Sequence, residues 1–265
     1  MKNFYILWVA LLVMNSAMAQ SCLPDGITFS TQEQIDNFQT LYPGCTEIEG
    51  DVTISDNWNG YITNLDGLSV LTSIGGSLEI YGNSQLSDLS GLGALTSVGG
   101  TLSIGYHPLW SGSGYGNAIL PSLNGLESLT DIGGNLNVIG NDSLTSLTGL
   151  NNLVSIGGGI VIYENSTLTS LTGLEGLTSV PGSIVLGHFG DLGMYYGNPL
   201  LPNLTGLDNL AHIGGDLYIL ASSSLLDLTG LESLENVEGT LRISEVPLLS
   251  SQLHDVYTTW QSADI

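Results

Sequence analysis

The sequence predicts a β-solenoid of about eight coils, and three observations lead to this fold class. A hexapeptide, Leu-Thr-Ser-Ile-Gly-Gly at 71–76, returns six more times in altered form, beginning at Leu95, Leu129, Leu153, Leu177, Leu210 and Leu234. The intervals between successive copies are 24, 34, 24, 24, 33 and 24 residues. A nearly fixed period in this range is typical of proteins in which each repeat packs on the next. Each copy is also followed by a short segment of alternating apolar residues, as in a strand with one buried face.

Residues 1–19 have the pattern of a secretory signal peptide. Lys2 supplies the positive start, an apolar run extends from Phe4 to Met14, and Ala17-Met18-Ala19 is a small-x-small cleavage site. The run is too short to cross a bilayer as a helix. We therefore expect an exported protein, extracellular or at the cell surface, with no membrane insertion after signal removal.

Residues 20–44 are predicted to form an N-terminal cap. Cys22 and Cys45 are the two cysteines of the chain, and such a pair in an exported protein predicts a disulfide. Between them, Ser30 or Thr31 can cap a short helix that ends at Pro43-Gly44. The apolar residues expected on one face of this helix are Ile35, Phe38 and Leu41. A helix stapled ahead of the first repeat would shield an open sheet edge.

Residues 45–249 are predicted to form the repeat solenoid. In the unit 71–94, we expect Gly75-Gly76 to form a tight turn, since glycine tolerates positive φ. The segment 77–81 then alternates, with Leu78 and Ile80 pointing inward. The corresponding inward pairs are Val52/Ile54, Leu102/Ile104, Leu136/Val138, Ile160/Ile162, Ile184/Leu186, Leu217/Ile219 and Leu241/Ile243. Eight such segments stacked in parallel would form one sheet.

An asparagine follows the strand in successive coils and predicts a hydrogen-bonded ladder. Its members are Asn83, Asn117, Asn141, Asn165 and Asn198. The ladder is expected to fail at Ser222 and Val246. The return path carries inward leucines at spacings of three, and a glycine marks its corner in each coil: Gly91, Gly125, Gly149, Gly173, Gly206 and Gly230.

These repeats resemble the bacterial branch of the receptor L-domain family, relatives of the leucine-rich-repeat proteins. The resemblance covers Cys22 to Leu249 and is most specific at the entry, 31–38 with Tyr42-Pro43-Gly44-Cys45, and in the iterated L-T-S-L-T-G-L-x-x-L-T-S-I-G-G. It implies a right-handed β-helix or leucine-rich-repeat-like solenoid that binds ligands, with no catalytic residues to carry over. Family members close with a cysteine-bearing helix, whereas the capping helix expected at 250–265 has no cysteine. Either that cap is shortened or the gene product continues past Ile265.

Two coils are about ten residues longer than the others, and both insertions fall between the strand and the ladder asparagine. They are rich in aromatic residues and histidine, and their candidate binding residues are Tyr106, His107, Trp110, Tyr115, His188, Phe189, Tyr195 and Tyr196. Insertions on one face of a repeat protein often form its binding face. The alternative is that these rings pack on each other or on the flank of the solenoid.

The outward face of the later strands is a second candidate surface. It carries apolar residues where the earlier strands carry Asp, Thr, Ser and Glu: Ile139, Val161, Tyr163, Val185, Tyr218 and Leu220. An exposed apolar stripe often marks a contact. Ordinary β-propensity at half-buried positions explains the same residues equally well.

The charge of the chain excludes several classes of partner. It has 25 acidic residues and two basic ones, Lys2 and Arg242, so its net charge is −23. Such a surface repels nucleic acid and anionic lipid. The spacing of His, Cys and acidic residues indicates no metal site, and the sequence indicates no cofactor.

The leading hypothesis is a non-enzymatic, exported binding or adhesion module that contacts a protein or a carbohydrate through the two aromatic insertions. The alternative is a structural or spacer region of a larger cell-surface protein. A carbohydrate-active enzyme is disfavoured, because no cluster of outward carboxylates repeats on neighbouring coils.

Overall fold

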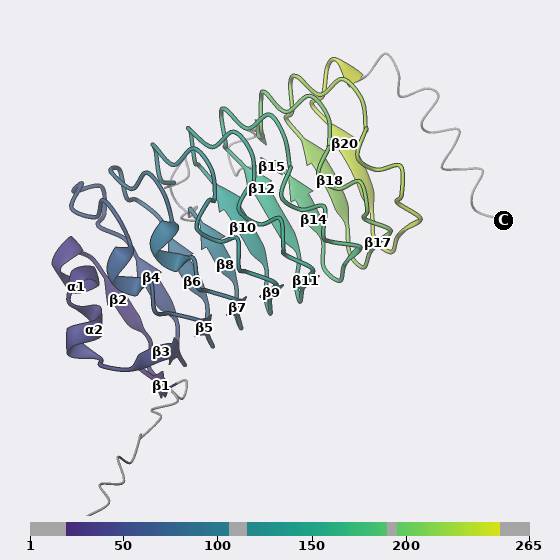
Figure 1. The fold of residues 1–265 in the computed structure, drawn as a ribbon. Coiled ribbons are helices and arrows are strands. Elements are labelled where there is room, and N and C mark those ends of the chain that lie inside the picture. The colour runs from purple at the N-terminus through teal and green to yellow at the C-terminus, as the bar shows by residue number, and fades with distance from the viewer. Residues whose placement is uncertain (1–19, 106–115, 190–194, 250–265) are drawn as a thin grey trace, which may run out of the picture.

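The computed structural model describes residues 20–105, 116–189 and 195–249. In this part the chain winds into a β-solenoid of about nine turns, stacked along one axis (Figure 1). The predicted signal peptide and the predicted C-terminal helix at 250–265 lie outside the described residues. The predicted β-solenoid fold class is confirmed.

The main sheet contains nine parallel strands, one for each turn. In spatial order they are β2 (Ile27–Phe29), β4 (Val52–Ile54), β6 (Leu78–Ile80), β8 (Leu102–Ile104), β10 (Leu136–Ile139), β12 (Ile160–Tyr163), β14 (Ile184–Leu186), β18 (Leu217–Leu220) and β20 (Leu241–Ser244). Eight of them are the predicted strands, and β2 was not expected. The inward pairs are buried in every predicted strand except the last, where Leu241 is 36% exposed.

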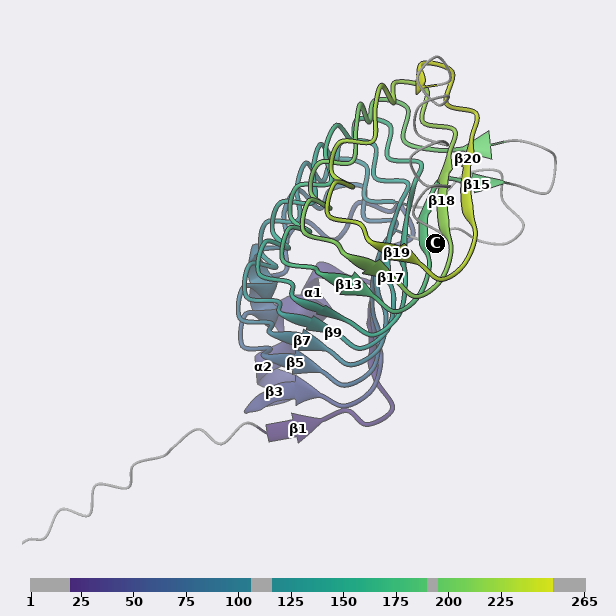
Figure 2. The same cartoon turned by 90° about the vertical axis from the view of Figure 1, so that its right-hand side faces the viewer.

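The repeated hexapeptide itself forms strands on a second side of the solenoid (Figure 2), which the sequence pattern did not predict. A six-stranded parallel sheet contains β1 (Gln20–Cys22), β3 (Cys45–Ile48), β5 (Ser73–Ile74), β7 (Ser97–Val98), β9 (Asp131–Ile132) and β11 (Ser155–Ile156). A three-stranded sheet continues with β13 (Ser179–Val180), β17 (His212–Ile213) and β19 (Asn236–Val237).

Pro181 accounts for the break between these two sheets. In the coils before it, a glycine N–H donates to the preceding coil, for example Gly157 N to Ile132 O at 2.8 Å. Proline has no N–H, so this bond cannot form at position 181. The register resumes one coil later, where Gly214 N donates to Val180 O at 2.8 Å.

The prediction that Gly75 and Gly76 adopt positive φ is wrong. Neither lies in the left-handed region. Both face the backbone of the preceding coil instead, where a Cβ on Gly75 would lie 2.6 Å from Glu49 O and one on Gly76 would lie 2.6 Å from Asp51 N. The glycine pair is therefore required for close approach between coils. Positive φ occurs at the return corner, as at Gly149 with φ 116°.

The predicted asparagine ladder is confirmed from Asn83 to Asn198, and all five side chains are fully buried. Each Nδ2 donates to the Oδ1 of the next asparagine at 3.1–3.4 Å and to a strand carbonyl of the preceding coil at 2.9 Å; Asn198 makes only the second of these bonds. Each Oδ1 also accepts the backbone N–H of the preceding ladder position. The ladder therefore satisfies the polar backbone at the bend that follows the main sheet.

Two short helices, α1 (Gln32–Asp36) and α2 (Phe38–Leu41), lie beside the first coils (Figure 1). Thr31 forms a capping box with Gln34, as the sequence allowed. Ile35 and Phe38 are buried, but Leu41 is 62% exposed, so its predicted place on the buried face is wrong. The chain separates into two helices at Asn37, which shifts Leu41 off that face. Whether the helices shield the sheet edge stays a prediction.

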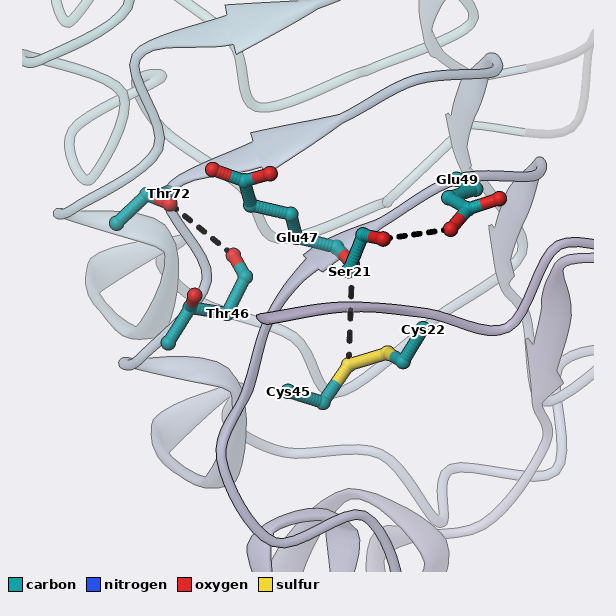
Figure 3. Close-up of a disulfide and its surroundings, with 7 residues drawn as sticks. All are labelled: Ser21, Cys22, Cys45, Thr46, Glu47, Glu49 and Thr72. Carbon is teal, nitrogen blue, oxygen red and sulfur yellow. Dashed lines mark hydrogen bonds between the residues drawn. A yellow bond between two sulfur atoms is a disulfide. The ribbon is translucent and has the colours of Figure 1, made fainter. Parts of the chain in front are cut away.

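The predicted disulfide joins Cys22 of β1 to Cys45 of β3, with the two Cα atoms 5.7 Å apart (Figure 3). Beside it, Ser21 Oγ donates to Glu49 Oε1 at 2.6 Å. The bond ties the first strand of the second sheet to the strand that follows the helices.

Candidate functional site

The second insertion forms a β-hairpin that leaves the main sheet after β14. Strand β15 (His188–Phe189) pairs antiparallel with β16 (Tyr195–Tyr196), and β15 lies outside the sheet in Figure 2. Gly187 begins the departure with φ 120°, and a Cβ there would lie 2.2 Å from Leu220 O. Only glycine therefore allows the chain to turn outward this close to the next coil.

The rings of the hairpin are packed in a row against the solenoid. Tyr163, at the end of β12, stacks on His188 with ring centres 5.4 Å apart, and His188 stacks on Tyr196 at 6.4 Å. On the other side of the hairpin, Phe189 and Tyr195 are in tilted contact at 4.8 Å. The row fixes the orientation of the hairpin, because its base is a Tyr163 side chain that is only 6% exposed.

A pocket of about 410 Å³ lies between the hairpin and the bend that the asparagine ladder supports. Tyr195 and Tyr196 line it from the hairpin, and Asp142, Glu164 and Ser166 line it from two neighbouring coils. Its volume is within the range of about 300–1,000 Å³ that is usual for ligand pockets. Its lining therefore combines two tyrosines of the hairpin with two acidic residues of the coils.

The ladder positions both carboxylates, because each is next to a ladder residue. Asp142 follows Asn141, and its Oδ1 accepts a hydrogen bond from Ser166 Oγ at 2.7 Å. Glu164 precedes Asn165, and its backbone N–H donates to Gly197 O at 2.9 Å. Both residues are therefore attached to buried, hydrogen-bonded backbone.

Glu164 has an unusual backbone conformation, with φ 57°. The equivalent position also has positive φ in other coils, at Gly82 (φ 67°), Gly140 (φ 71°), Ala221 (φ 53°) and Glu245 (φ 58°). The left-handed region is unfavourable for a residue with a Cβ. A carboxylate therefore occupies a position for which the backbone favours glycine.

The neighbouring Tyr163 is held in its neutral form. Burial, and then the negative charge of Glu164, raise the pKa of the Tyr163 hydroxyl to about 12. Tyr163 therefore adds no negative charge beside the pocket at neutral pH.

The structure brings part of the predicted binding set together. His188, Phe189, Tyr195 and Tyr196 share the hairpin, and the packing of their rings on one another and on the solenoid is observed. Phe189 nevertheless remains 50% exposed. The other predicted binding residues, Tyr106, His107, Trp110 and Tyr115, lie outside the described residues.

The second predicted surface is largely covered. Ile139, Tyr163 and Leu220 are buried, so they do not form an exposed stripe. They are the last residues of β10, β12 and β18, at the bend that follows the main sheet. What remains of the stripe is half-buried: Val161, Val185 and Tyr218.

Asp142, Glu164 and Ser166 were not predicted as site residues. Glu164 carried a usable signal, because it occupies the position of Gly82 and Gly140 before the ladder asparagine. Asp142 and Ser166 carried no such signal in the sequence, since isolated polar residues after the ladder position are common in this chain.

Comparisons of the chain with known protein families, with curated proteins and with solved structures find no match. Within residues 20–105, 116–189 and 195–249, no group of three or more His, Cys, Asp or Glu side chains is arranged to hold a metal ion. None of the helices in the same ranges is long and apolar enough to span a bilayer.

Proposed function

We propose that this chain is an exported, non-enzymatic binding module, and that the pocket beside β15–β16 is its contact site. One observation carries the proposal: an insertion that interrupts the regular coil brings Tyr195 and Tyr196 to a pocket that Asp142 and Glu164 also line. A solenoid needs no such hairpin for its own packing, since the coils without an insertion make the same bend without one. Tyrosine rings and carboxylates are also groups that recur in protein and carbohydrate recognition.

Two further features support export. The disulfide between Cys22 and Cys45 is typical of proteins that mature in an oxidising compartment. The pattern of residues 1–19 is that of a secretory signal. Both fit a partner outside the cell, such as a surface protein or a glycan.

A binding screen tests the proposal. The chain is immobilised and exposed to soluble polysaccharides and to a library of synthetic peptides. Tyr195→Ala removes a pocket ring, and Tyr61→Ala is the matched control, because Tyr61 is 57% exposed and does not line the pocket. We expect at least one ligand to lose tenfold or more in affinity with Tyr195→Ala and to keep its affinity with Tyr61→Ala. The proposed site is contradicted if no compound in the screen binds, or if both variants bind every ligand equally.

A further inference from the structure

The charge around the pocket restricts what it can bind. The chain carries 25 acidic residues, and Arg242 on β20 is the one Lys or Arg among the described residues. Asp142 and Glu164 both line the pocket, and no Lys or Arg does. An anionic ligand would be repelled by the pocket and by the whole surface. The electrostatic field of a cleft lined by negative charge instead raises the local concentration of cations.

The two carboxylates come from adjacent coils, which are about 4.8 Å apart in a parallel sheet. The hydrogen bond from Ser166 Oγ holds the Asp142 carboxylate at the pocket wall. Asp142 follows its ladder asparagine and Glu164 precedes its own, so the two residues are also offset along the coil. Carboxylates that line one pocket can each accept from a guanidinium or ammonium group, which presents several N–H donors.

The hairpin residues of the lining suit the same kind of ligand. Tyr195 and Tyr196 both line the pocket, and His188 stacks on Tyr196. The face of an aromatic ring attracts a cation, and it also covers the apolar stem of a Lys or Arg side chain. A neutral sugar would use the rings and would gain nothing from the net charge.

We infer that the pocket lined by Tyr195, Tyr196, Asp142 and Glu164 binds an Arg or Lys side chain of a polypeptide partner. This inference rests on the proposed function and names its ligand class.

Titration with short peptides tests the inference. The probes are Gly-Gly-Arg-Gly-Gly with blocked ends, its Lys counterpart, and a counterpart with citrulline, which keeps the shape of arginine without its charge. Binding is followed by NMR at low ionic strength, with the full chain. We expect the citrulline peptide to bind at least tenfold more weakly than the Arg peptide. We also expect added salt to weaken the binding of the Arg and Lys peptides.

Two double variants separate the pocket from the overall charge. Asp142→Asn/Glu164→Gln neutralises the pocket, and Asp25→Asn/Glu238→Gln makes the same change of net charge at exposed residues that do not line it. We expect the first variant to lower the affinity for the Arg peptide at least tenfold and the second to lower it less than twofold. Equal effects of the two variants, or equal binding of the Arg and citrulline peptides, would overturn the inference.

Glu164→Gly provides a variant that the local backbone accommodates, because Gly82 and Gly140 occupy this position with similar positive φ. We expect this variant to raise the melting temperature and to lower the affinity for the Arg peptide. A rise in melting temperature with unchanged peptide affinity contradicts the role of Glu164. If a neutral glycan binds in a manner that depends on Tyr195 while the Arg peptide does not bind, the inference is wrong and the proposed function stands.

Discussion

Replacement of Asn141 by alanine tests the importance of the asparagine ladder. Asn141 is fully buried, and its Nδ2 donates to Ile104 O at 2.9 Å, Ile139 O at 3.1 Å and Asn165 Oδ1 at 3.4 Å. Its Oδ1 accepts the backbone N–H of Asn117 at 2.9 Å and the Asn117 Nδ2 at 3.3 Å. The variant therefore removes five hydrogen bonds and takes a partner from buried groups in both neighbouring coils.

The expected cost follows from the groups left without this partner. A buried donor or acceptor that loses its hydrogen bond costs about 1–3 kcal/mol. The Asn117 N–H and the Ile104 carbonyl are two such groups, so we expect Asn141→Ala to lower the free energy of unfolding by about 2–6 kcal/mol. A typical domain has about 5–15 kcal/mol in total.

Urea unfolding and amide hydrogen exchange measure this loss. Since each coil contacts only its neighbours, exchange should accelerate most around Asn117 and least in α1. Asn152→Ala is the control, because Asn152 is exposed and its side chain makes one hydrogen bond, to Glu127 O at 2.7 Å. A loss below about 1 kcal/mol for Asn141→Ala, or a loss no larger than that of the control, would refute the account of the ladder.

Three other predictions concern single features of the fold. Burial, and then the charge of Asp51, raise the pKa of Glu79 above its ordinary value of 4.5. The folded state therefore binds more protons than the unfolded state just above pH 4.5. The free energy of unfolding consequently decreases as the pH rises through this range. Glu79→Gln should raise the melting temperature at pH 7 and have little effect below pH 4; an equal effect at both would contradict burial and Asp51 as the cause. Asp56, at the ladder position of its coil, has a buried Oδ1 without a hydrogen-bond partner among the described residues, while its Oδ2 accepts two backbone N–H groups at 2.7 and 2.9 Å. Asp56→Asn should raise the unfolding free energy by about 1 kcal/mol in urea, and a lower midpoint would count against it. Removal of the disulfide by Cys22→Ser/Cys45→Ser should cost about 3 kcal/mol in thermal unfolding, and a variant as stable as the oxidised chain would disprove this.

The periodic part of the fold could be predicted from the sequence because the same kind of side chain returns at the same position of successive repeats. A 24-residue period places Leu78 beside Leu102 and Asn117 beside Asn141, and the structure has these neighbours. The second sheet could not be predicted in the same way. Its strands are mostly two residues long, as in Ser73–Ile74, and too short to show alternation.

The candidate site was only half predictable, for a different reason. The long interval between repeats identified the insertion that carries Tyr195 and Tyr196. The acidic part of the lining depends on which residues of adjacent coils come together at the bend, and Asp142 and Glu164 belong to different repeats. The glycine pair was misinterpreted because sequence shows where glycine is needed without showing whether φ or close contact requires it.

The uniform bonding of the ladder has a consequence for how such a chain can change its length. Asn117 makes with Asn141 the same bonds that Asn141 makes with Asn165. Duplication or loss of one 24-residue coil would therefore join two ends that already fit each other. The inward leucines and the strand register would be preserved in the same operation. Growth by whole coils therefore keeps the ladder bonds, whereas the insertion of about ten residues after β14 leaves the main sheet as the hairpin β15–β16.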